Sequence, residues 1–225
     1  MSNPINYPAD YLYTLVASPD FSEDGVIFAA RRTGLYRSSD RGQSWLPVFQ
    51  SLGLETLLPT TAVALSPNCS SDQTVFAAVE GNVLRSVDGG ETWTYTELGQ
   101  PAPLVSALCL PPDFSRRDLL LAGTLDDGIL RSTNHGATWH RWNFGLLDPH
   151  IFALHFTLDG TIYAGTESGI FSPTNQGRAW REIDFPMDLA PVISLAAAGE
   201  VLFAGTEENG MYLSQDSGGN WQQLA

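Results

Sequence analysis

The sequence predicts an all-β protein: a five-bladed β-propeller in which each blade is a four-stranded antiparallel sheet. The first observation is an eight-residue segment, ending in Trp, that occurs five times. Its copies are residues 38–45, 86–93, 132–139, 173–180 and 214–221. The second is the spacing of the five final tryptophans, which is 48, 46, 41 and 41 residues. A propeller blade needs about 40 to 50 residues, so each repeat predicts one blade.

Within each repeat, short apolar runs separated by Gly, Pro, Asn and Asp indicate four strands. First strands are expected at 13–18, 61–66, 105–110, 151–156 and 192–197, and second strands at 26–30, 74–78, 119–123, 161–165 and 201–205. Both sets are nearly continuous in Val, Ile, Leu, Phe and Ala, which is typical of strands covered on both faces. The more polar fourth strands belong on the outer rim, and no helix is expected.

The repeats place the blades at about 11–53, 60–99, 104–146, 150–186 and 191–225 of a single domain, 1–225. Each blade contains its own first and fourth strand, so no strand is exchanged to close the ring. Closure would then depend on packing alone. We favour a five-bladed monomer. The alternative is a homodimer in which two chains form one ten-bladed ring.

The eight-residue segment has the composition of a tight turn between the third and fourth strands. Asp and Asn bond their own backbone two residues on, Gly permits positive φ, and the Ser hydroxyl closes further backbone bonds. The Trp is expected to pack between blades. The residues given these structural roles are Ser38, Asp40, Gly42, Trp45, Ser86, Asp88, Gly90, Trp93, Ser132, Asn134, Gly136, Trp139, Asn175, Gly177, Trp180, Ser214, Asp216, Gly218 and Trp221.

This repeat closely resembles the Asp-box, or bacterial neuraminidase repeat, of sialidases, sortilin-type receptors, xyloglucanases and photosystem assembly factors, and the resemblance spans essentially the whole chain. The resemblance implies a β-propeller in which the turn is structural and lies on the outside, away from the substrate. The fourth copy departs from the pattern at Pro173 and Ala179, and the fifth has Asn220. We expect these two turns to be looser.

The composition excludes several kinds of function. The formal charge is −14, with 25 acidic residues against 11 basic ones, and the sequence has no Lys. A lysine Schiff base and a P-loop lysine are therefore absent, and the acidic surface disfavours nucleic acid as a partner. The sequence shows no signal peptide or membrane span, so we expect a cytoplasmic protein, or an exported one if a signal peptide has been removed. Cys69 and Cys109 are expected to be free thiols.

The candidate binding face is where the loops between second and third strands meet the loops that link the blades. The linking loops, near 50–60, 99–104, 144–150 and 185–191, are rich in Leu, Pro and Phe. The candidate binding residues on this face are Arg31, Arg32, Glu80, Asp126, Asp127, Glu167, Glu207 and Glu208. The acidic ring either attracts a basic partner or reflects ordinary turn chemistry.

No catalytic motif is recognised. Arg37, Arg85 and Arg131 precede the turn Ser, the wrong place for a sialidase arginine triad, so we expect them to pair or stack. A glycosidase would need two carboxylates about 5 to 9.5 Å apart, for which Asp126 or Asp127 with Glu167 or Glu207 are the candidates. The four histidines have no metal-ligand spacing. We expect no metal and no cofactor.

Together these features favour a non-enzymatic propeller scaffold that binds a protein or peptide on the loop face, because exposed apolar residues beside charges are typical of protein interfaces. The alternative is a carbohydrate-binding protein or a small glycosidase that uses the same face, so a glycan partner is kept open. Nucleic acid and membrane are not expected partners.

Overall fold

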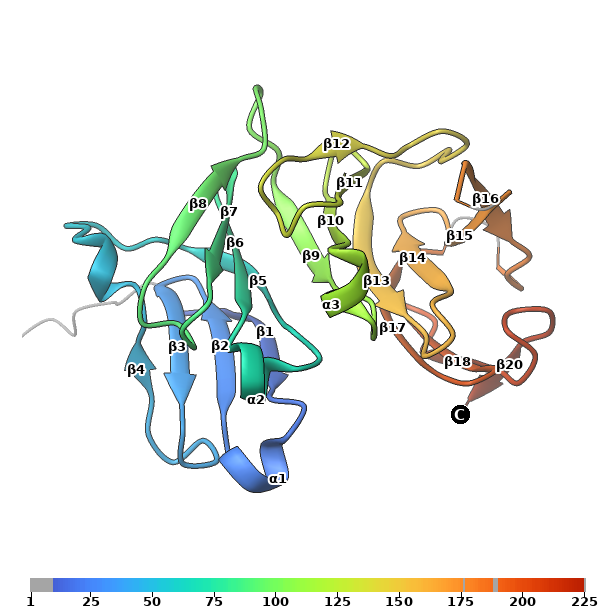
Figure 1. Cartoon of the computed structure of the whole chain (residues 1–225). Coiled ribbons are helices and arrows are strands. Elements are labelled where there is room, and N and C mark those ends of the chain that lie inside the picture. Colours follow the sequence, from blue (N-terminus) through green and yellow to red (C-terminus); the bar gives the residue numbers. More distant parts are fainter. Residues whose placement is uncertain (1–9, 176, 188–189, 225) are drawn as a thin grey trace, which may run out of the picture.

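The computed structural model describes residues 10–175, 177–187 and 190–224, which form five antiparallel four-stranded sheets in a propeller arrangement (Figure 1). In each sheet the strands are hydrogen-bonded in chain order. The first two blades contain β1 (Leu12–Ala17), β2 (Ile27–Arg31), β3 (Gly34–Ser38), β4 (Leu46–Pro47), β5 (Thr60–Leu65), β6 (Val75–Val79), β7 (Asn82–Ser86) and β8 (Thr94–Glu97). The predicted fold class, with no strand exchanged between blades, is confirmed.

The other three blades follow the same order. Their strands are β9 (Val105–Cys109), β10 (Leu120–Thr124), β11 (Ile129–Ser132), β12 (His140–Arg141), β13 (Ile151–Phe156), β14 (Ile162–Thr166), β15 (Ile170–Thr174), β16 (Ala179–Ile183), β17 (Val192–Ala198), β18 (Val201–Thr206), β19 (Met211–Ser214) and β20 (Gln222–Leu224). The first and second strands begin and end within about one residue of the prediction because their apolar runs end at Gly, Pro or polar turn residues.

The expectation of no helix is wrong. Three one-turn helices, α1 (Phe21–Asp24), α2 (Cys69–Asp72) and α3 (Phe114–Arg117), join first to second strands, and a 3₁₀ turn, η1 (Gln50–Leu52), follows β4. In α1 the Ser18 hydroxyl donates to Asp24 at 2.6 Å, and Asp24 accepts the Val26 N–H at 2.8 Å. α2 repeats this pattern with Ser66, Asp72 and Thr74. These turns lie outside the sheets, and none is long and apolar enough to cross a membrane.

The eight-residue turns contain a repeated hydrogen-bond pattern. In the second copy, the buried Ser86 hydroxyl donates to Asp88 at 2.7 Å and accepts the Gly90 N–H at 2.8 Å. The fifth copy has equivalent bonds despite Asn220, whose side chain also donates to Asp216. In the fourth copy Pro173 supplies no hydroxyl, and the Gly177 N–H donates to the Thr174 carbonyl instead.

The tryptophans of the turns are buried or half-buried, and two of them join neighbouring blades directly. Trp93 donates its indole N–H to the Val48 carbonyl of blade 1 at 3.0 Å and packs edge-on against Phe49. Trp180 donates to the Trp142 carbonyl of blade 3 at 2.7 Å. These contacts place apolar area and a hydrogen bond at the blade junctions.

The blades form an open arc rather than a closed ring. The inner strands pack in sequence, β1 on β5, β5 on β9, β9 on β13 and β13 on β17, but no comparable packing joins β17 to β1 among residues 10–224 as described. Figure 1 shows blade 1 and blade 5 at the two ends of the arc. The ring closure by packing that a five-bladed toroid requires is therefore not formed within this chain.

Candidate functional site

The loops between second and third strands meet the blade-linking segments at one end of the strands. Four backbone N–H groups of these loops donate to linker carbonyls: Arg32 to Tyr11, Leu125 to Leu104, Glu167 to His150 and Glu207 to Pro191. Because each blade is an antiparallel meander, the eight-residue turns lie at the opposite end of the strands. The candidate loop face is thus a continuous surface separate from those turns.

Buried threonines close the loops of blades 3 to 5. Thr124 donates its hydroxyl to the Gly128 carbonyl at 2.9 Å and accepts the Asp127 N–H at 2.8 Å. Thr166 and Thr206 make similar bonds in the next two blades. The carboxylates of these loops are therefore not needed to close them.

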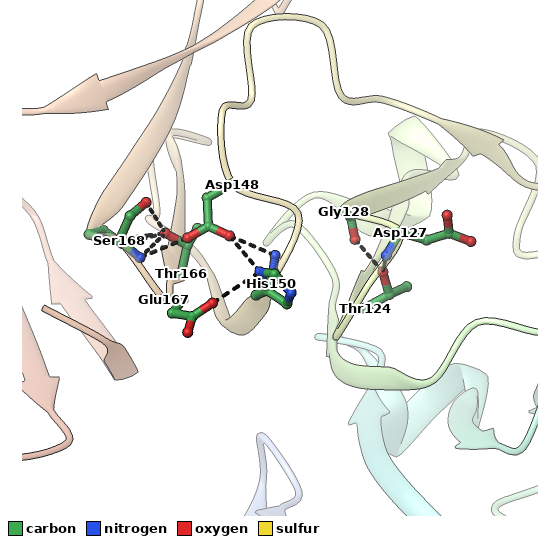
Figure 2. A network of polar contacts seen from close by, with 9 residues as sticks. Thr124, Asp127, Gly128, Asp148, His150, Thr166, Glu167 and Ser168 are labelled. Atoms are coloured by element: carbon green, nitrogen blue, oxygen red, sulfur yellow. Dashed lines mark hydrogen bonds and ion pairs between the residues drawn. The ribbon is translucent and has the colours of Figure 1, made fainter. Parts of the chain in front are cut away.

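A polar cluster lies where the linker before β13 meets the β14–β15 loop (Figure 2). Asp148 accepts the backbone N–H of His150 at 2.9 Å and that of Ser168 at 2.7 Å, so its carboxylate clamps the linker to the loop. The His150 Nδ1 atom lies 3.0 Å from Asp148 Oδ1 and 3.1 Å from Glu167 Oε2. One imidazole nitrogen is thus shared between two carboxylates.

Asp148 is anionic in this setting. Its burial alone would raise the pKa of the carboxyl group, but the hydrogen bonds from His150 and Ser168 outweigh burial and hold the pKa below its usual value. Glu167, in contrast, is largely exposed and faces solvent beside His150. The cluster therefore combines one fixed buried carboxylate with one accessible carboxylate.

The cluster lines a groove of about 810 Å³ formed by blade 4, the linker that enters it and Pro191 of the next linker, which we call the linker groove. Its lining consists of Leu147, Asp148, Pro149, His150, Glu167, Ser168, Phe171, Glu182 and Pro191. The apolar side chains of Leu147, Pro149 and Pro191 thus lie in the same groove as the carboxylates of Glu167 and Glu182. Among the described residues, no ion pair engages Glu182, which leaves its carboxylate free to contact a ligand.

The same three side chains have the donor set for a divalent cation. One ligand atom each from Asp148, His150 and Glu167 lies within 4.8 Å of the other two. An imidazole nitrogen with two carboxylate oxygens suits Zn²⁺, and the groove would leave a further coordination position open. A His150 Nδ1–H that donates to the two carboxylates also satisfies the cluster without an ion.

The structure separates most of the other predicted binding residues. Arg31 forms an ion pair with Asp10 and lies over the Tyr36 ring. Asp127 binds Arg141 at 2.7 Å, in a loop away from the cluster (Figure 2). Glu80 lines another groove, of about 610 Å³, with Tyr13 and linker residues of blade 3. Arg32, Asp126, Glu207 and Glu208 are exposed.

Sequence reasoning missed Asp148, His150 and Glu182. His150 has no metal-ligand spacing from another His. Its partner Asp148 lies two residues earlier in the linker, and Glu167 comes beside it because β13 pairs with β14, with Ile151 opposite Thr166. The arginines before the turn Ser pack as expected. Arg37 pairs with Glu91, Arg85 lies over the Phe76 ring, and Arg131 lies over the Trp142 ring.

No family model matches the sequence, and no curated protein matches it. Solved structures share the fold. The extracellular domain of BT4673 from B. thetaiotaomicron has a TM-score of 0.74 and 18% identity over 97% of this chain and 28% of its own. The GH74 xyloglucanase from Xanthomonas campestris has a TM-score of 0.74 and 18% identity over 96% of this chain and 38% of its own. This chain therefore spans well under half the length of either protein.

A third similar structure is YCF48 bound to a D1 peptide. It has a TM-score of 0.69 and 15% identity, over 99% of this chain and 69% of its own. At these identities the likeness concerns the fold alone. The neighbours nevertheless comprise a peptide-bound propeller, a glycoside hydrolase and an extracellular domain, so this fold serves several functions.

Proposed function

We propose that this protein is a non-enzymatic propeller scaffold that binds an extended peptide segment of a protein partner in the linker groove. The observation that carries the proposal is the pairing, in one groove, of accessible Glu167 and Glu182 carboxylates with apolar Leu147, Pro149 and Pro191. A peptide with an Arg or Lys flanked by apolar residues matches this surface, because carboxylates bind such cations while apolar walls exclude water.

Two further points support this function. The carboxylates of the β14–β15 loop are not used to close it, since Thr166 does so. YCF48, a structure similar in fold, is bound to a peptide. We also propose that the eight-residue turns are Asp-box turns that hold the blades in place and take no part in binding.

The test measures fluorescence anisotropy of two labelled peptides, one with an arginine between leucine and proline residues and one with neutral citrulline in its place. We expect a dissociation constant on the order of 1–100 µM for the arginine peptide. Glu167→Gln with Glu182→Gln should weaken its binding about tenfold. The matched control is Glu207→Gln with Glu208→Gln, which removes the same charge from the same face outside the groove.

Equal binding of the arginine and citrulline peptides would contradict the proposal, as would equal losses in the two double variants. Two carboxylates in one groove also favour a second candidate, a carbohydrate-binding protein or small glycosidase. Its test is incubation with xyloglucan, the polymer named for one similar structure. Release of reducing ends that Glu167→Gln abolishes would support an enzyme instead of the scaffold.

A further inference from the structure

The outer faces of blades 1 and 5 have the form of blade-to-blade contact surfaces. Equivalent residues can be compared directly, because all five blades have the same register and the same irregularity between the first and second strands. The first residue of the first strand, for example, pairs with the last residue of the second strand in every blade. The comparison shows which positions lack a neighbour.

On blade 1 the uncovered position is Leu12. Its equivalents, which face the preceding blade, are Thr60, Val105, Ile151 and Val192. These four are at most 1% exposed, whereas Leu12 is 55% exposed. Leu15 is likewise 56% exposed, although its equivalent Val63 is buried. Blade 1 therefore presents apolar side chains that elsewhere are covered by a preceding blade.

On blade 5 the uncovered position is Met211. Its equivalents, which pair with the same position of the second strand, are Leu35, Val83, Ile129 and Ile170. These four are at most 2% exposed, whereas Met211 is 46% exposed. Met211 lines a groove of about 680 Å³ with Ile193, Phe203, Gly205 and Leu224. Blade 5 therefore presents the other side of a blade junction.

The two faces are complementary. A Cβ on Gly123 would lie 2.5 Å from Ile151 of the next blade, and one on Gly165 would lie 2.5 Å from the Val192 carbonyl. The equivalent Gly205 has only Ser194 of its own blade nearby. Ile151 and Val192 are the equivalents of Leu12. The space beside Gly205 therefore corresponds to the position that a Leu12 side chain of a following blade would occupy.

A second pair of positions agrees with the first. Gly90 and Gly136, in the second and third eight-residue turns, pack against Phe28 and Phe76 of the preceding blades. Phe203 is the blade 5 equivalent of these phenylalanines. Gly42, in the first turn, contacts only its own blade. Phe203 and Gly42 are thus the remaining halves of a contact that occurs at the first two junctions of the chain.

We propose that the outer face of blade 5 binds the outer face of blade 1 of a second copy, head to tail. The partner is a second copy because each copy carries one of each complementary face, and the two faces of one chain lie at opposite ends of the arc (Figure 1). The strands that carry these faces, β1 on blade 1 and β17, β18 and β19 on blade 5, contain no charged residue. Such a contact closes into a ring if its rotation permits and otherwise extends.

The test is the solution mass as a function of concentration, measured by sedimentation velocity at moderate salt, since the charge of −14 opposes association. We expect a mass that rises above the 24.4 kDa of one chain. Leu12→Glu and Met211→Glu should each weaken self-association at least about tenfold. Both side chains are exposed in the single chain, so each variant should fold, which circular dichroism checks.

The decisive sample is an equimolar mixture of the two variants. The Leu12→Glu chain keeps its blade 5 face and the Met211→Glu chain keeps its blade 1 face, so the mixture should regain one contact and form a dimer. The control is Leu158→Glu, which changes an 82% exposed leucine in the turn between β13 and β14 and should have no effect. Both a mass that stops at two chains and one that continues to rise support the proposal.

Three results would overturn it. One is a mass of 24.4 kDa at every concentration up to about 1 mM. Another is an effect of Leu158→Glu as large as that of the two face variants. The third is a mixture that stays as dissociated as each variant alone, because face-to-face or nonspecific contacts would not be restored by mixing.

Discussion

At the residue scale, the aspartates of the first two eight-residue turns are partly exposed carboxyl groups with low pKa values. Hydrogen bonds from the side chain and backbone of Ser44, and from Ser38, lower the pKa of Asp40 to about 2. Asp88 has the same arrangement with Thr92 and Ser86, and its pKa is also about 2. Because both carboxylates are partly exposed and therefore screened by solvent, the stabilisation of each turn is modest.

The sign of the pH dependence follows from these pKa values. A carboxyl group whose pKa is lower in the folded chain contributes stability above its unfolded pKa, near 4, and this contribution is lost as the pH falls toward 2. We predict that the melting temperature of Asp40→Asn with Asp88→Asn depends less on pH between about 4 and 2 than that of the parent chain. Differential scanning calorimetry across this range is the measurement.

The control for this prediction is present in the chain. Asn134 occupies the equivalent position in blade 3 and donates to the Thr138 hydroxyl at 2.9 Å while accepting its backbone N–H. An amide therefore fits the turn, so the double variant should fold normally at neutral pH. If the slope of melting temperature against pH is unchanged in the double variant, these aspartates are not the cause of the loss of stability at low pH.

At the element scale, the tryptophan of a turn stabilises the chain according to whether a preceding blade covers it. Trp93 is 8% exposed and contacts blade 1, whereas Trp45 is half-buried and donates only to Gly42 of its own turn. We predict that Trp93→Ala lowers the free energy of unfolding by about 3–5 kcal/mol. Trp45→Ala should cost less than half as much in dilute solution, as measured by urea unfolding. Equal losses would contradict this difference.

Glycines in the second strands are predicted to differ in the same way. A Cβ on Gly165 would meet the Val192 backbone, which cannot move without shifting β17, so Gly165→Ala should cost about 1–3 kcal/mol of unfolding free energy. On Gly205 a Cβ meets the Ser194 side chain, which can rotate. Gly205→Ala should therefore be the milder change in urea unfolding. A larger loss of unfolding free energy for Gly205→Ala than for Gly165→Ala would contradict an uncovered blade 5 face.

At the whole-molecule scale, the open arc makes the stability uneven. Each blade is stabilised by its neighbours, and blades 1 and 5 have a neighbour on one side only. We predict that hydrogen exchange is slowest in β6, β10 and β14 and faster in β2 and β18. Mass spectrometry of peptic fragments is the measurement. Protection of β2 and β18 should rise with protein concentration if copies associate, and uniform protection at low concentration would contradict an open arc.

Much of this fold was predictable from the sequence, because its determinants are local and repeated. Turn residues and the strand-length apolar runs between them specify each blade without reference to the rest of the chain. The one-turn helices were missed, although residues 18–24 and 66–72 share Ser, Pro, Asp or Asn, Ser and Asp at the same spacing. That repeat was the available signal, and it encodes the hydroxyl-to-carboxylate bond that closes each turn.

The site was less predictable because its residues are separated in the sequence. Glu167 was expected on the loop face, and it meets His150 because β13 pairs with β14, with Ile151 opposite Thr166. The bonds by which Asp148 accepts the N–H groups of His150 and Ser168 depend on the conformation of the linker before β13, which no residue pattern indicated. Glu182, on β16, joins the same groove only because its strand pairs with β15.

Local hydrogen bonding and hydrophobic pattern, repeated five times, are enough to specify the blade, the number of blades and the chemistry of their turns. The curvature of the array, and therefore which faces remain uncovered, emerges only in the folded chain. These features depend on small rotations between packed sheets. The rotations add up over five blades, and no single stretch of the sequence encodes them.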